Sequence, residues 1–80
     1  MLAEERSNAE IARRIYDLRT KVGLTQAALA KRIGTTASVI SKLEDADYEG
    51  HSLSMLQRIA AVLGLRVTIG FERVKRGRAA

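Results

Sequence analysis

Five small or polar residues at helical spacing form the part of the sequence best suited to chemistry: Thr36, Ala37, Ser38, Ser41 and Lys42. The hydroxyls donate or accept hydrogen bonds, the ammonium donates them, and the alanine methyl makes apolar contacts. Ser38 and Ser41 have no nearby base that would activate a hydroxyl as a nucleophile. The set therefore predicts recognition by hydrogen bonding, and the chain is not expected to be an enzyme.

Two short helices joined by a tight turn would present these five residues on an outer face. Gly34 is expected to end the first helix, because glycine enters the left-handed region at little steric cost, and Thr35 can cap the next helix. The apolar residues face one another across the turn: Leu29 and Ile33 before it, Ile40 and Leu43 after it. The pattern predicts a helix-turn-helix over about 26–33 and 36–45, whose second helix can enter a DNA major groove.

The charge distribution agrees with a phosphate-facing surface. The net charge is +5, and the stretch between Leu18 and Leu43 holds five basic residues and no acid: Arg19, Lys21, Lys31, Arg32 and Lys42. Acidic residues follow directly: Glu44, Asp45, Asp47 and Glu49. The basic block coincides with the motif, which favours a nucleic-acid partner over chance clustering on a solvated face.

Two further helices are expected to complete a four-helix domain. The first would run from a cap at Ser7 or Asn8, with an apolar stripe of Ile11, Ile15, Leu18 and Val22. The last would span about 53–63 after a cap at Ser52. His51 falls in the connecting loop, where we expect no chemical role for it.

After this helix the period changes to two, which is typical of a β-strand. Apolar side chains alternate with others and share one side: Leu65, Val67, Ile69 and Phe71. No second strand is visible in the sequence, so we expect the same strand of a second copy to pair with it, antiparallel across a two-fold axis. A fifth helix or a frayed tail is the alternative.

Length and composition limit the other possibilities. With 80 residues, no cysteine and one histidine, the chain has no disulfide and no thiolate metal site, and neither a metal nor a cofactor is expected. No apolar run approaches the roughly 20 residues that span a bilayer, and the acidic N-terminus does not read as a signal peptide, so a cytoplasmic location is expected. The expected organisation is a helical DNA-binding domain over 1–64, a dimerisation strand over 65–73 and a basic disordered tail over 74–80. That tail is expected either to bind DNA phosphate or an acidic partner, or only to aid solubility.

The stretch Gly23-Leu24-Thr25-Gln26 through Leu43-Glu44, and on to Ile59–Leu65, resembles the lambda-repressor-like (Xre/Cro) helix-turn-helix family. The likeness covers about residues 10–65 and implies an all-α, four-helix, sequence-specific DNA-binding domain. In that family the glutamine matching Gln26 bonds a phosphate, with Thr25 beside it. Many members carry glutamine or arginine where this chain has Ala37 and Ser38, so its base-reading set is poor in bidentate groups.

Geometry divides the expected DNA contacts into two sets. Base edges would be touched by Thr36, Ala37, Ser38, Ser41 and Lys42. The sugar-phosphate backbone would be touched by Arg19, Lys21, Thr25, Gln26, Lys31 and Arg32. In a homodimer the two reading helices would enter successive major grooves about 34 Å apart, which predicts a palindromic operator in double-stranded DNA.

The C-terminal part narrows the resemblance. A four-helix repressor-like domain with the segment Glu44–Leu53, followed by a strand directly after Leu63-Gly64-Leu65, is similar to HigA-type and HipB-type antitoxins. This likeness implies a transcriptional repressor that autoregulates its operon and binds a cognate toxin. Two alternatives stay open: a stand-alone Xre-type regulator, and a protein-binding adaptor module with a vestigial DNA face.

Overall fold

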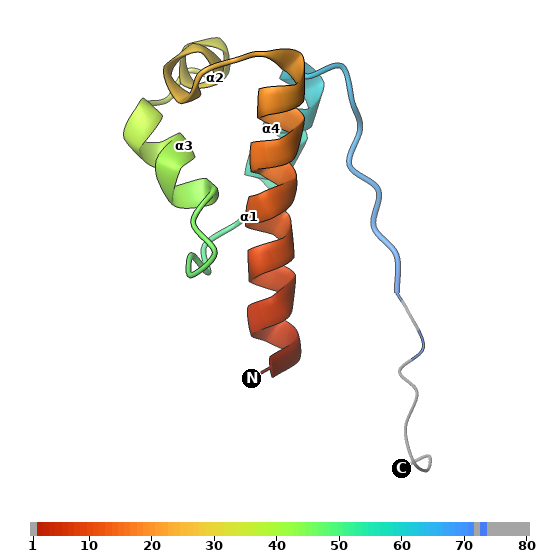
Figure 1. Ribbon diagram of the computed structural model, residues 1–80. Helices are drawn as coiled ribbons and strands as arrows, with labels where there is room; N and C mark the ends of the chain where they lie inside the picture. Colours follow the sequence, from red (N-terminus) through yellow and green to blue (C-terminus); the bar gives the residue numbers. More distant parts are fainter. Residues whose placement is uncertain (1, 72, 74–80) are drawn as a thin grey trace.

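Four helices make up the fold in the computed structural model, which describes residues 2–71 and 73 and, for side chains, residues from Asn8 onward. They are α1 (Leu2–Val22), α2 (Gln26–Ile33), α3 (Ala37–Leu43) and α4 (Leu53–Val62). Figure 1 shows α1 as a long rod whose N-terminal half extends beyond the other three helices. The expected all-α, four-helix domain is confirmed, while the predicted basic tail over 74–80 lies outside the described residues.

Side-chain caps fix the helices of the motif. The Thr25 hydroxyl accepts a hydrogen bond from the Ala28 amide, and α2 ends at Gly34, whose φ of 89° lies in the left-handed region. The cap of α3 is Thr36, one residue later than expected, and its hydroxyl accepts from the Val39 amide. α3 therefore begins one residue later than predicted, and it also ends before the predicted residue 45, at Leu43. In contrast, α2 has the predicted bounds.

The first helix begins earlier than the sequence indicated. It starts at Leu2, so neither Ser7 nor Asn8 caps it. The reason is local: the preceding segment Leu-Ala-Glu-Glu-Arg consists of strong helix formers, and their propensity outweighs the weak preference of Ser and Asn for a cap. The last helix has the expected Ser52 cap, whose hydroxyl accepts from the Met55 amide.

The core lies where α2 meets its neighbours. α2 packs against both α3 and α4, and Ile15 of α1 joins the core cluster that these helices form. Leu29 and Ile40 are completely buried, as the apolar pattern across the turn predicts. The stripe expected on α1 is only partly correct. Val22 is 54% exposed, and the buried residues between Asn8 and Val22 are Ala12, Ile15 and Arg19.

A buried ion pair links α1 to the end of α3. The Arg19 guanidinium donates to both carboxylate oxygens of Glu44, at 2.6 Å from Nε and 2.9 Å from Nη2. Its third donor, Nη1, binds the Leu24 carbonyl oxygen at 2.7 Å. Because the side chains are only 9% and 4% exposed, each charge depends on the other for its stabilisation.

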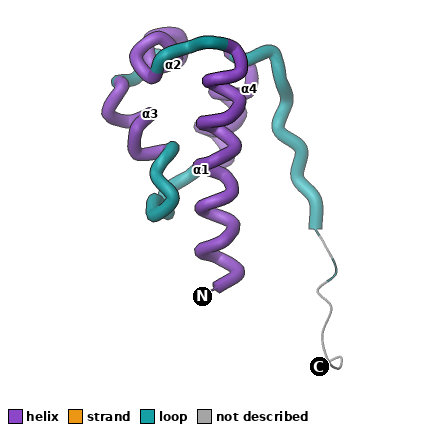
Figure 2. The backbone as a smooth tube through the Cα atoms, viewed as in Figure 1, coloured by secondary structure: helices purple, strands orange, loops and turns teal. Residues whose placement is uncertain are grey.

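The expected C-terminal strand is not formed. Residues 65–71 carry neither helix nor strand and lead away from the helical body (Figures 1 and 2). The turn before them is fixed by Gly64, at a φ of 74°, and by a bond from the Leu65 amide to the Ala60 carbonyl oxygen. A strand needs a neighbouring strand for its backbone groups, and residues 2–71 provide none.

Replacing Glu44 with alanine should destabilise the fold strongly, because the Arg19 charge would stay buried without its partner. We expect the free energy of unfolding in urea to fall by about 3–5 kcal/mol. The matched control is Asp17→Ala, which removes the acid of the Arg13–Asp17 pair, exposed at 75% and 53%. That change should cost less than about 1 kcal/mol. Equal losses for the two variants would contradict the structural role given to the buried pair.

Candidate nucleic-acid interface

The outer face of α3 is exposed, and its inner face is buried. Ile40 and Leu43 point into the core at 0% and 3% exposure. The residues expected to read bases are all exposed: Thr36, Ala37, Ser38, Ser41 and Lys42. The structure therefore gathers this predicted set on one short helix, although the Thr36 hydroxyl already accepts the Val39 amide at 3.3 Å and offers mainly its O–H.

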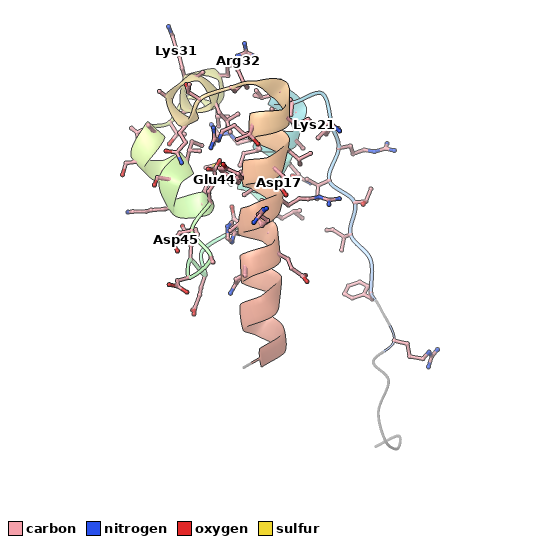
Figure 3. The ribbon with its side chains drawn as sticks, in the orientation of Figure 1. Asp17, Lys21, Lys31, Arg32, Glu44 and Asp45 are labelled. Carbon is pink, nitrogen blue, oxygen red and sulfur yellow. The ribbon has the colours of Figure 1, made fainter. Side chains whose placement is uncertain are left out.

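The residues expected to touch the DNA backbone are more widely spread. Thr25 and Gln26 lie together where α2 begins, and Lys31 and Arg32 lie exposed at its other end. Figure 3 shows these last two side chains projecting outward from α2. Lys21 is also exposed, but Figure 3 places it on the far side of α1 from α3. The predicted backbone set is therefore not one continuous surface.

Arg19 does not lie on this surface. It is 7% exposed, and its guanidinium is occupied by Glu44 and the Leu24 carbonyl. The prediction from the sequence therefore assigned a core residue to the DNA-facing surface. The hydrogen bond to Glu44 raises the Arg19 pKa above its ordinary value, although burial opposes the shift. A raised pKa adds stability that is lost only when the pH rises past it, so the arginine stays charged throughout the physiological range.

Gln26 is tied to the same buried pair. Its Nε2 donates to Glu44 Oε1 at 3.1 Å, so the carboxylate receives hydrogen bonds from α1 and from α2. The sequence suggested neither partner, because Glu44 follows Gln26 by 18 residues and Arg19 by 25. This carboxylate therefore connects the core to the edge of the candidate interface.

Two other side chains hold the ends of the motif helices, and neither contact could be predicted from the sequence. Arg58 of α4 donates from Nη2 to the Ile33 carbonyl oxygen at 2.6 Å, beside the turn at Gly34. His51 Nε2 lies 2.7 Å from the Leu43 carbonyl oxygen, which can only accept, so this nitrogen carries the proton. His51 thus has a structural contact where the sequence suggested none, and its ring meets Tyr48 edge-on.

Neither a metal site nor a membrane-spanning helix is found in the part of the chain that the structure describes. No three His, Cys, Asp or Glu side chains of residues 8–71 and 73 gather closely enough to hold a metal ion. None of the helices in this part combines the length and the apolar character that a bilayer crossing requires.

Comparison with solved structures finds the same arrangement of helices inside a larger enzyme. Hydroxypropylphosphonic acid epoxidase from S. wedmorenis matches with a TM-score of 0.67 and 32% identity, over 74% of this chain and 31% of that one. Its structure in complex with fosfomycin matches with a TM-score of 0.65 and 33% identity, over 72% and 31%. Less than a third of the enzyme chain is therefore represented here.

Comparison with known sequences gives the family. A curated protein of Acanthamoeba polyphaga mimivirus, named an uncharacterized HTH-type transcriptional regulator, is 39% identical over 59 residues, 71% of this chain and 26% of that protein. The chain thus spans about a quarter of this relative's length. A family model described as helix-turn-helix matches residues 15–69, more than half of the chain and the whole of α2, α3 and α4. The chain belongs to the lambda-repressor-like (Xre) helix-turn-helix family.

Proposed function

We propose that the chain is a transcriptional regulator that reads double-stranded DNA with the outer face of α3. The observation that carries the proposal is the two-sided character of this helix: Ile40 and Leu43 anchor it, and every residue predicted to read bases is exposed. Membership of the helix-turn-helix family and the mimivirus regulator support DNA binding as the activity.

The proposed contacts follow from the charges around α3. Base edges would meet the five exposed residues of its outer face, and Thr25, Gln26, Lys31 and Arg32 would bind phosphates from α2. Beyond the C-terminal end of α3, the exposed acids Asp45, Asp47 and Glu49 would repel phosphate. The productive contacts should therefore be concentrated on the outer face of α3, as far as Lys42, and on α2.

We also propose that the regulator binds as a homodimer. After α4, apolar side chains are left exposed, with Leu65 at 47%, Ile69 at 64% and Phe71 at 99%. Together with Val67 they form the side of the predicted strand, and a second copy would supply both the missing backbone partner and apolar cover. Two α3 helices related by a two-fold axis would suit a palindromic operator with half-sites about one helical turn apart.

A narrower proposal concerns the role in the cell. As a cytoplasmic repressor and antitoxin, the chain would repress its own operon and bind a toxin. This rests on its likeness to HigA-type and HipB-type antitoxins: a four-helix domain, the segment Glu44–Leu53 and a predicted strand directly after Leu63-Gly64-Leu65. Repression without a toxin is the competing role, and the mimivirus relative, named only as a transcriptional regulator, is consistent with it. Co-purification of the tagged chain with the product of an adjacent gene would separate them.

The epoxidase likeness does not lead us to propose catalysis. It covers the helical domain and less than a third of the enzyme, and the described residues of this chain form no cluster of metal-binding side chains. The part that the two proteins share is the helix-turn-helix arrangement. We therefore propose a non-enzymatic regulator.

Removal of the Lys42 ammonium should weaken DNA binding, because this side chain lies exposed on the proposed reading face. With a duplex selected from a random-sequence pool, Lys42→Ala should raise the Kd about 5- to 100-fold in fluorescence anisotropy. Arg66→Ala removes the same charge from the segment after α4 and should change the Kd about twofold at most. Equal effects of the two variants, or wild-type affinity that does not fall with salt, would refute the proposed face.

A charge on the exposed apolar side of the C-terminal segment should break the proposed dimer. We expect wild-type protein to sediment as a dimer at micromolar concentration, and Ile69→Asp to sediment as a monomer, because a buried carboxylate in the paired strand would be unsatisfied. Thr68→Asp, on the opposite side of the predicted strand, is the matched control and should remain dimeric. A monomeric wild type would overturn the proposed assembly.

A further inference from the structure

The Glu44 carboxylate is the hub of a small network beneath the proposed interface. Its side chain is 4% exposed, and three N–H groups reach its two oxygens: Nε and Nη2 of Arg19, and Nε2 of Gln26. The two arginine bonds come from a fixed planar fork, so they hold the carboxylate in one orientation. Glu44 therefore offers Gln26 a rigid acceptor at 3.1 Å.

This acceptor decides which way the Gln26 amide faces. An ionised carboxylate can only accept hydrogen bonds, so the amide must turn its nitrogen toward Glu44. One of the two N–H groups of Nε2 is used in this way, and among residues 8–71 and 73 no partner is present for the other N–H or for Oε1. The side chain is partly exposed and belongs to the first residue of α2.

We propose that Glu44 is a positioning residue that holds the Gln26 amide ready to donate its second N–H to a DNA phosphate; this rests on the proposed DNA-binding function. A free glutamine side chain loses rotamer entropy when a ligand fixes it. In this protein the Gln26 side chain loses its rotamer entropy when the chain folds, not when DNA binds. The contact with phosphate is therefore tighter, although no new group is added at the interface. Arg19 acts one step further back, because it fixes the carboxylate.

The test exchanges the buried pair for apolar side chains and leaves the net charge unchanged. Arg19→Met with Glu44→Leu removes one positive and one negative charge, and apolar residues of similar volume commonly replace a buried ion pair without loss of stability. The double variant frees Gln26 without changing the long-range attraction to DNA. Circular dichroism and urea unfolding would verify that it folds.

Affinity for a mixed-sequence 30-base-pair duplex would be measured for four proteins: wild type, Gln26→Ala, the double variant and the triple variant. We expect Gln26→Ala to raise the Kd about three- to tenfold in the wild-type background and less than twofold in the double variant. The salt slope should stay the same in all four, because a neutral amide releases no counterion. An equal cost of Gln26→Ala in both backgrounds would refute the positioning role.

A measurement on the unmodified protein guards against a variant that fails to fold. The 15N–1H heteronuclear NOE of the side-chain amide should be high for Gln26 and low for Gln57, an exposed glutamine on α4 that serves as the internal control. Equally low values would overturn the proposal even if DNA binds. A wild type that binds no duplex would refute the proposed function itself, and the NOE would still show whether Glu44 holds Gln26.

Discussion

A buried ion pair between Arg19 and Glu44 helps to fix where α3 lies relative to α1. Glu44 is the C-cap of α3, and its carboxylate is held by a guanidinium from α1 at 2.6 and 2.9 Å. Apolar packing through Ile40 and Leu43 is strong but not directional, whereas a two-bond contact between planar groups sets an orientation. The placement of α3 therefore depends on this pair as well as on the core.

Much of the motif could be predicted from the sequence, because its determinants are local. Gly34 ends α2 in the left-handed region, and Thr25 and Ser52 cap the helices that follow them, as their residue types indicate. The period of Leu29, Ile33, Ile40 and Leu43 identified the buried face and, by exclusion, the exposed one. The face proposed to read DNA thus follows from spacing alone.

What the sequence did not reveal depends on contacts between distant residues. Relative to the buried Ile15, Arg19 lies four positions later, and Leu18 and Val22 lie three and seven positions later. The helical period therefore allows either Arg19 or the pair Leu18 and Val22 to share the inner face with Ile15. Polarity favoured Leu18 and Val22, but Glu44, 25 residues away from Arg19, makes the arginine the buried residue. The conformation of the segment after α4 also depends on distant contacts. Its alternating pattern predicts a strand, but residues 2–71 contain no partner strand for it.

We expect DNA to meet the exposed side of α3. Amide chemical-shift changes in a 15N-labelled sample, titrated with duplex, test it most directly. The largest changes should fall at residues 36–42 and at Thr25 and Gln26, with small changes at the exposed residues of α1, which are Arg13, Arg14, Tyr16 and Asp17. Changes concentrated on α1 or on the segment after α4, with α3 unaffected, would contradict it.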